Sequence, residues 1–317
     1  MSRCGTRQRF TVAGLPDWSS ILFAMLRVRE HVTLKDFTTL KVGGTARYFF
    51  SVSTAETLAE AVLFARGKKL PLVVLGGGSN VIVSDTLIDA LVVKIEIQGI
   101  EWVEDVLKCR DFDILKSQHL NMSESQNSNI STSQNVLVVA GAGESWDALV
   151  GEAVKRGLWG IENLSGIPGT VGAAPIQNIG AYGAEIQNVL EWVEVFDAKT
   201  GKIRTLPNHE CFFGYRDSIF KTPRGRDLII TRVALRLSKN GTPHLEYKDL
   251  KERFKNKDSG FKNPTVQEIR QAVLEIRIRK FPNLRQFGTA GSFFKNPIIP
   301  KRQFDELKKK YPDLVGY

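Results

Sequence analysis

The sequence is poor in cysteine and contains no long apolar run. Its 317 residues include three cysteines, at positions 4, 109 and 211. They lie too far apart to form the paired clusters of a disulfide scaffold or of a structural zinc site, so we expect reduced thiols and no metal site. No apolar run approaches the roughly 20 residues of a membrane-spanning helix, and the apolar residues 21–26 are too short for a signal peptide. We therefore expect a cytoplasmic protein that does not enter membranes.

The common fingerprints of nucleotide-binding loops are also missing. The glycine clusters at residues 76–78 and 141–143 lack the third glycine of G-x-G-x-x-G, because Val81 and Trp146 occupy its place. No G-x-x-x-x-G-K-[ST] segment exists either. The first cluster nevertheless leaves the backbone free to approach a phosphate, and Ser79 and Asn80 add polar groups beside it. Taken alone, this loop fits a tight structural turn better than a phosphate cradle.

The net charge of +10 comes from the C-terminal part of the chain. Residues 1–200 carry 18 Lys or Arg and 22 Asp or Glu, whereas residues 201–317 carry 26 and 12. Such a basic region attracts a polyanion or a small ligand with phosphates and carboxylates, or it is simply a solvated face. Aromatic residues interleaved with the charges, and known nucleic-acid motifs, are not evident. We therefore expect no nucleic-acid partner.

Length and apolar content predict two or three domains of mixed α+β structure. The chain has 317 residues, of which 42% are apolar, enough for a sizeable core. A strand at residues 47–52, a helix that starts with a capping box of Ser53 and Glu56 and stops at Gly67, and a buried strand at residues 71–75 form a β-α-β unit. A second such unit starts with a strand at residues 136–141 and a helix that stops at Gly157.

Two segments of biased composition interrupt the predicted strands and helices. Strands are predicted at residues 189–196 and 228–237, and Thr265 and Glu268 cap a helix. Residues 117–135 are mostly Ser, Asn and Gln, which predicts an exposed, mobile insertion. Residues 162–185 contain too much Gly and Pro for regular structure and too many apolar residues for a linker. We interpret them as backbone that lies against a large flat ligand.

Five motifs occur in order along the chain, at residues 38–47, 75–80, 167–183, 214–221 and 288–297. Together they closely resemble the UDP-N-acetylenolpyruvoylglucosamine reductase (MurB) family, from about Arg27 to the last residue. The resemblance implies an α+β protein with an FAD-binding fold of the vanillyl-alcohol oxidase/PCMH type. Its two subdomains would be residues 27–98 and 99–240, followed by an α+β substrate-binding domain at residues 241–317. Residues 1–26 would be an unstructured N-terminal extension.

The resemblance also implies an activity, that of a flavoenzyme of peptidoglycan precursor synthesis. NADPH would reduce FAD, and the reduced flavin would reduce the enolpyruvyl ether of a UDP-sugar to UDP-N-acetylmuramate. This agrees with glycine-rich segments that hold a large phosphate-bearing ligand, and it gives the basic region an anionic substrate. The resemblance further implies a cytoplasmic monomer of the type with a substrate-closing tyrosine loop.

The implied chemistry needs a fixed cation and a proton donor. Hydride delivery to the enolpyruvyl group pushes negative charge onto its carboxylate, which a cation stabilises, and a positioned acid then protonates the neighbouring carbon. The resemblance assigns these tasks to Arg216 and Ser292. It assigns substrate binding to Tyr247, Lys280 and Asn296. It assigns FAD binding to Gly76, Gly77, Gly78, Ser79, Asn80, Gly143, Ile167, Gly172, Ala173 and Ile179, with Arg277 facing the flavin or its substrate.

Simpler interpretations of these residues stay open. Arg216 could form a local ion pair with its acidic neighbour, and Ser292 could be a turn serine. Tyr247 and Lys280 could be ordinary surface residues with amphipathic stems. The amide pair at residues 177–178 could satisfy buried backbone groups near the flavin.

The function also has competing interpretations. A different PCMH-type flavin oxidase or dehydrogenase would keep the glycine loops but lack the Ser292 motif and Tyr247. The family continues into a segment with a glutamate that assists protonation, whereas this sequence ends at Tyr317. We therefore expect a C-terminally truncated substrate domain, intact FAD binding and impaired turnover. A non-enzymatic fragment that binds only FAD is the remaining alternative.

Overall fold

The computed structural model describes residues 28–104, 134–255, 263–283 and 286–316. The expected N-terminal extension and most of the expected insertion lie outside these residues, as do Cys4 and Cys109. Asn135 is described and is the first residue of a strand, so the insertion ends earlier than predicted. Among the described helices, none is both long and apolar enough to cross a membrane.

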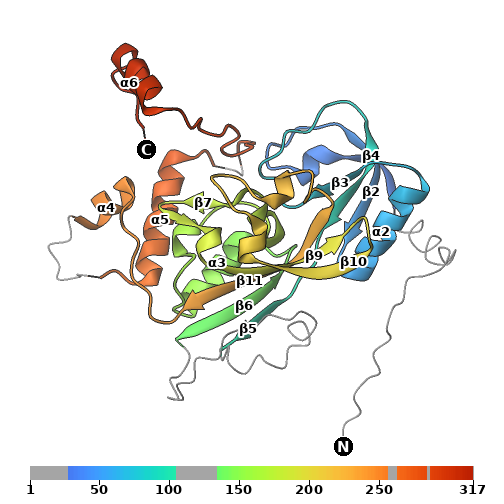
Figure 1. Ribbon diagram of the computed structural model, residues 1–317, viewed down its shortest axis with the longest axis horizontal. Helices are drawn as coiled ribbons and strands as arrows, with labels where there is room; N and C mark the ends of the chain where they lie inside the picture. Colours follow the sequence, from blue (N-terminus) through green and yellow to red (C-terminus); the bar gives the residue numbers. More distant parts are fainter. Residues whose placement is uncertain (1–27, 105–133, 256–262, 284–285, 317) are drawn as a thin grey trace, which may run out of the picture.

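The N-terminal sheet confirms the first predicted β-α-β unit. It contains β1 (Arg29–Thr33), β2 (Thr45–Val52), β3 (Leu72–Leu75) and β4 (Ile88–Ile95). Their order is β1-β2-β4-β3, with β2, β4 and β3 parallel and β1 antiparallel at the edge. Helix α2 (Ala55–Gly67) connects β2 to β3 and lies beside this sheet (Figure 1). The strand β4 therefore enters between the two strands of the predicted unit.

Helix α2 ends at Gly67 as predicted, but its N-cap lies one residue later than predicted and its left-handed residue is Lys69 instead of Gly67. Thr54 is the N-cap, and its hydroxyl accepts a hydrogen bond from Thr57 N at 3.2 Å while Thr57 Oγ1 accepts one from Thr54 N at 3.0 Å. The prediction of a box that starts at Ser53 is wrong because these two threonines satisfy the free amides instead. Gly67 is still helical, and Lys69 takes the left-handed conformation with φ of 55°.

The strand β3 is less buried than predicted. Val73 and Val74 are 40% and 45% exposed. The reason is position, because β3 is an edge strand and pairs only with β4 among the described strands. Val74 also faces a cavity.

The second sheet contradicts the prediction of a second β-α-β unit. It contains β5 (Ile100–Val103), β6 (Asn135–Gly141), β9 (Leu190–Asp197), β10 (Lys202–Pro207) and β11 (Leu228–Ser238) in the order β10-β9-β11-β6-β5. All its pairs are antiparallel. The predicted strand and helix both exist, as β6 and α3 (Trp146–Lys155), and Gly157 ends the helix with φ of 71°. However, the irregular residues 158–188 then lead to β9, which lies next to β11 rather than parallel to β6.

Short elements connect the sheets. The chain forms a small hairpin of β7 (Gly180–Ala181) and β8 (Ala184–Glu185). The 3-10 helices are η1 (Leu34–Phe37), η3 (Glu162–Leu164), η4 (Val171–Ala173), η5 (Pro175–Gln177), η6 (Ile186–Asn188), η7 (Asn208–Cys211) and η8 (Ile219–Lys221). Three of these 3-10 helices and both strands of the hairpin fall within residues 162–185, where no long helix or strand was predicted.

Three helices follow β11: α4 (Lys248–Lys255), α5 (Val266–Lys280) and α6 (Lys301–Lys310). The capping box of Thr265 and Glu268 at the start of α5 is confirmed. Helix α5 packs against α3, α4 and η3. Helix α6 has no buried residue and stands apart from the other elements in Figure 1.

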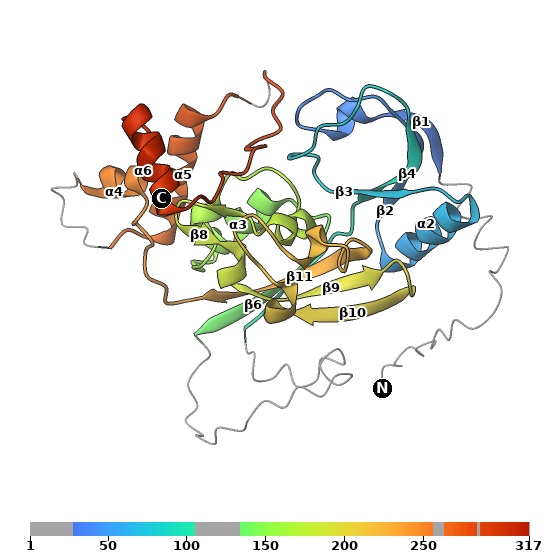
Figure 2. The same ribbon diagram turned by 45° about the horizontal axis from the view of Figure 1, so that its top comes forward.

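One hydrophobic core joins the two sheets. It includes Phe50 and Leu58 from the first sheet and its helix, and Trp146, Leu149 and Val193 from the second sheet region. A smaller cluster forms around α5, and a third lies beneath η1. Figure 2 shows how the sheets meet, with the connecting segments of residues 158–188 above the second sheet.

Candidate functional site

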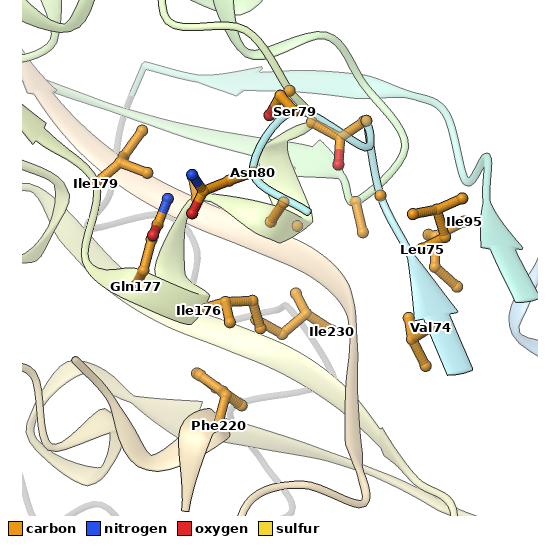
Figure 3. Close-up of a pocket in the computed structure, with 18 of the residues that line it drawn as sticks. Val74, Leu75, Ser79, Asn80, Ile95, Ile176, Gln177, Ile179, Phe220 and Ile230 are labelled. Atoms are coloured by element: carbon orange, nitrogen blue, oxygen red, sulfur yellow. The ribbon is translucent and has the colours of Figure 1, made fainter. Parts of the chain in front are cut away.

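A cavity of about 460 Å³ lies where the two sheets meet. This volume is typical of sites for small molecules. Its walls come from β3 and the glycine loop after it, from residues 167–179, and from η8 with the start of β11. In Figure 3, Ser79, Asn80 and Gln177 present polar groups on one side, while Val74, Leu75 and Ile95 form an apolar wall on the other. The cavity can therefore hold a ligand with both polar and apolar parts.

The glycine loop is built by close approach of two backbones. A Cβ atom on Gly77 would lie 2.6 Å from Gly169 Cα, and one on Gly78 would lie 2.0 Å from Phe37 O. Gly78 also has φ of 62°, which favours glycine. The loop is thus both a tight turn and part of the wall of a cavity, and the two interpretations of this loop do not exclude each other.

One polar group in the cavity has no partner. The hydroxyl of Thr170 is buried and forms no hydrogen bond with any described residue, although Thr170 lines the cavity. Buried polar groups are almost always satisfied. This hydroxyl is packed against Gly76 of the glycine loop, so it is an unsatisfied polar group in the wall of the cavity. It lies inside the motif at residues 167–183, but no local pattern singled it out.

Most of the predicted cofactor residues meet in this cavity. Its lining includes Gly76, Gly77, Gly78, Ser79, Asn80, Ile167, Gly172, Ala173 and Ile179. Two predicted residues do not line it. Gly143 instead donates a hydrogen bond to Ile97 O at 2.8 Å, where a Cβ would lie 2.5 Å from Glu96 C. Arg277 lies on α5, and its side chain passes close to Gly166.

The segment that contains Ser292 is attached to the glycine loop. Asn80 Nδ2 donates hydrogen bonds to Ala290 O at 2.8 Å and to Ser292 O at 3.1 Å. Thr39 Oγ1 donates to Thr289 O at 2.7 Å. Gly291 has φ of 66°, so Ser292 does follow a turn. The structure therefore places Ser292, which is exposed, beside a residue that lines the cavity.

Arg216 has an unusual backbone and a backbone partner. Its φ is 53°, and its guanidinium donates to Gly180 O at 2.5 Å. Within the described residues it forms no ion pair with Asp217, so the local ion pair considered above is not formed. Its loop is held by Asn178, which is fully buried and donates to Gly214 O at 3.0 Å. Asn178 thus satisfies a backbone group, as one interpretation predicted.

Tyr247 and Lys280 form a second group, which includes Tyr182. The rings of Tyr182 and Tyr247 meet edge to face with centroids 5.1 Å apart. Lys280 Nζ lies 5.6 Å from the centroid of the Tyr247 ring and 2.5 Å from Asp249 Oδ2. That hydrogen bond to Asp249 raises the pKa of Lys280, so this amine is a cation at neutral pH. Asn296 is exposed and belongs to neither group.

An ion pair between helices α3 and α5 holds the backbone just before the cavity-lining residues 167–170. Asp147 accepts hydrogen bonds from both terminal nitrogens of Arg270, at 2.7 and 3.1 Å, and from Gly166 N at 2.6 Å. Burial opposes ionisation of Asp147, but the bonds from Arg270 and Gly166 outweigh it and lower the pKa of the carboxyl. Burial also lowers the pKa of Arg277, which faces the same carboxylate and Tyr182. Sequence reasoning missed Asp147 because its partner is 123 positions away.

Comparison with known proteins agrees with this geometry. The FAD binding domain family matches residues 46–110 and 113–207. A UDP-N-acetylenolpyruvoylglucosamine reductase of Pseudomonas aeruginosa is 38% identical over 292 residues, which cover 92% of this chain and 77% of that protein. The enzyme of the same name from Ralstonia nicotianae is 39% identical over 293 residues, which cover 92% and 78%.

A solved structure is also similar. The crystal structure of UDP-N-acetylenolpyruvylglucosamine reductase (MurB) from Thermus caldophilus superposes with a TM-score of 0.56 and 30% identity, covering 88% of this chain and 80% of that chain. The expected α+β FAD-binding fold is thereby confirmed. This chain belongs to the UDP-N-acetylenolpyruvoylglucosamine reductase (MurB) family, whose members are FAD-dependent oxidoreductases of peptidoglycan precursor synthesis.

Proposed function

We propose that this chain uses NADPH to reduce UDP-N-acetylglucosamine enolpyruvate to UDP-N-acetylmuramate through bound FAD. The observation that carries the proposal is the cavity, because it gathers nine predicted cofactor residues from two motifs about 90 positions apart. A shared wall of this kind is what a large ligand with phosphates needs.

The residues of the cavity fit FAD. The loop of Gly76, Gly77 and Gly78 lines the cavity on one side and packs against the protein on the other with no room for a Cβ, so bare backbone faces the ligand space. Ser79, Asn80 and Gln177 add polar side chains to the same cavity. When bound, FAD supplies hydride transfer, and the protein supplies binding and orientation. Gly143 and Arg277 do not line the cavity; Gly143 is bonded to Ile97 O, and the Arg277 side chain lies beside Gly166, the residue that precedes the cavity wall.

Arg216 would stabilise charge on the substrate. Its guanidinium is anchored to Gly180 O through one nitrogen, which leaves further donors for a carboxylate. Hydride addition to the methylene carbon gives an enediolate, and a preorganised cation beside it lowers the barrier. The left-handed backbone of Arg216 indicates that its position is enforced by the surrounding loop.

Ser292 would donate the proton that completes the reaction. It lies next to Asn80 of the glycine loop, so substrate beside the cavity is within reach of the same segment. Tyr247, Lys280 and Asn296 would bind the remainder of the UDP-sugar. The excess of cations in residues 201–317 favours approach of this anionic substrate.

The two half-reactions test this proposal. Anaerobic NADPH should bleach the flavin absorption of the purified chain, and the enolpyruvyl UDP-sugar should then restore it. Ser292→Ala should leave bleaching unchanged but slow the restoration by about 10²- to 10⁴-fold, since it removes a positioned acid. Bleaching without restoration in the unsubstituted chain would contradict the proposal, and equal slowing of both steps by Ser292→Ala would contradict the role of Ser292.

A further inference from the structure

Asn163 holds two separate loops with one buried side chain. It lies in η3 and is 1% exposed. Its Nδ2 donates hydrogen bonds to Tyr182 O at 2.8 Å and to His244 O at 2.9 Å. Because both partners are carbonyl oxygens, only the amide nitrogen can face them. The orientation of this side chain is therefore fixed by its surroundings.

The loop that contains His244 leads directly to Tyr247. Residues 241–246 form no helix or strand. Among the described residues, the bond from Asn163 to His244 O is the only hydrogen bond that this segment makes. Its other contacts are apolar or steric: Leu245 packs against the cluster around α5, and a Cβ on Gly241 would lie 2.3 Å from Trp159 Cβ. Loss of the bond would leave the backbone before Tyr247 without a polar anchor.

The second loop carries Tyr182, whose ring touches that of Tyr247. Tyr182 has φ of 50°, and its ring is 5.1 Å from the Tyr247 ring between centroids. Gly180 in the same turn accepts the hydrogen bond from Arg216. Asn163 thus fixes the turn whose Tyr182 ring contacts Tyr247 and whose Gly180 carbonyl accepts the hydrogen bond from Arg216.

On its other side, Asn163 is continuous with the cavity wall. Ser165 Oγ closes η3 by donating to Glu162 O at 2.5 Å, and Gly166 N donates to Asp147. Residues 167–170 then line the cavity. Only three residues separate Asn163 from the cavity wall, and its side chain bonds both loops that carry the tyrosine pair. The position of the two tyrosines relative to the cavity wall therefore depends on this side chain.

We propose that Asn163 is a positioning residue that sets the Tyr247 loop relative to the cavity and so governs affinity for the UDP-sugar. The inference rests on the proposed function for the substrate that Tyr247 meets. The buried Oδ1 atom of Asn163 has no partner among the described residues. An unsatisfied buried acceptor is unfavourable, so another interaction of this side chain must offset its cost. The two hydrogen bonds that Nδ2 donates offset this cost.

Asn163→Ala should separate KM from kcat. The KM for the enolpyruvyl UDP-sugar should rise about tenfold, because two hydrogen bonds to the substrate-side loops are lost, one of them buried and one part-buried. The flavin content and the rate of bleaching by NADPH should stay unchanged, because neither hydrogen-bond partner of Asn163, Tyr182 or His244, lines the cavity. Asn208→Ala is the matched control: Asn208 Nδ2 also donates to two carbonyls, Gln187 O at 2.8 Å and Leu190 O at 2.7 Å, but away from the cavity. It should change KM by less than about twofold.

Hydrogen–deuterium exchange gives a readout that does not require turnover. In Asn163→Ala, amides of residues 241–250 and 180–183 should exchange faster, while those of residues 76–80 should not change. Asn208→Ala should leave all three segments unchanged. Unchanged exchange at residues 241–250, or faster exchange without a rise in KM, would overturn the inference.

Two further arms keep the test decisive. If Asn163→Ala does not retain flavin, Asn163→Ser preserves one donor in a smaller volume; loss of flavin from both variants would overturn the inference and make Asn163 part of the cofactor scaffold. In a double variant with Tyr247→Ala, the effects on KM should be less than additive, because Asn163 acts through Tyr247; full additivity would count against it. An unsubstituted chain that never reoxidises its flavin would refute the proposed function alone, since the exchange result still judges Asn163.

Discussion

The cavity wall and the C-terminal segment are held in place by different means. Around the glycine loop, backbones touch with no room for a single Cβ atom. From residue 293 on, by contrast, Phe294 is 89% exposed, and α6 has no buried residue. The part of the site that fits FAD is therefore preformed, whereas the substrate side depends on a few polar contacts, such as those that Asn80 makes to residues 290 and 292 and those that Asn163 makes to Tyr182 and His244.

The largest effect that separates the regions should come from apolar truncation. Leu149→Ala removes a fully buried side chain of the main core and should lower the free energy of unfolding by about 2–5 kcal/mol. Phe294→Ala removes an exposed ring and should change it by less than about 0.5 kcal/mol. Urea unfolding followed by circular dichroism measures both. Similar effects of the two substitutions would contradict the contrast between the regions.

The second effect concerns glycines. Gly77→Ala should lower the free energy of unfolding by about 1–3 kcal/mol, because the new Cβ would lie 2.6 Å from Gly169 Cα and one backbone must move. Gly67→Ala is the control, since nothing lies within 4 Å of its Cβ position in α2, and it should be neutral or stabilising by up to about 1 kcal/mol. A stable Gly77→Ala chain would show that the two backbones are not fixed against each other.

The smallest effect is one of pH at the Asp147–Arg270 ion pair. The pKa of Asp147 is lowered in the folded chain, so its stabilisation is present above its ordinary value near 4 and is lost as the pH falls below it. Asp147→Asn should cost about 1–2 kcal/mol of unfolding free energy at pH 7, a figure reduced for partial exposure of the carboxylate.

Denaturation at pH 7 and at pH 3 tests this assignment. Asp147→Asn should lose less stability between these two pH values than the unsubstituted chain does. Asp89→Asn is the control, because the exposed Arg47–Asp89 pair at 2.7 Å contributes little. Equal pH dependence in the unsubstituted chain and in Asp147→Asn would refute the role of this pair.

Much of the site was predictable because its signals are local. The glycines of residues 76–78 and the motif at residues 167–183 are contiguous in sequence, and the structure brings them to one cavity. The strand and helix positions followed from periodicity, with errors of a residue or two at α2. The topology of the second sheet was not predictable in this way, because an irregular segment and not a direct crossover follows α3.

The residues that sequence reasoning missed act over long separations. Asp147 meets Arg270, and Asn163 meets His244, across 123 and 81 positions. Each is an ordinary polar residue in a helical segment, and nothing nearby in the sequence marks its partner. The hydroxyl of Thr170 stands out only because the structure shows it buried without a hydrogen-bond partner among the described residues.

The most direct test of the account is a titration of the purified chain with FAD. Binding is measured by the quenching of flavin fluorescence during the titration. The account predicts one FAD per chain in the unsubstituted protein and in Gly67→Ala, and loss of binding in Gly77→Ala. Undiminished FAD binding by a folded Gly77→Ala chain would contradict it, because the flavin would then be held elsewhere than in the cavity formed by the glycine loop.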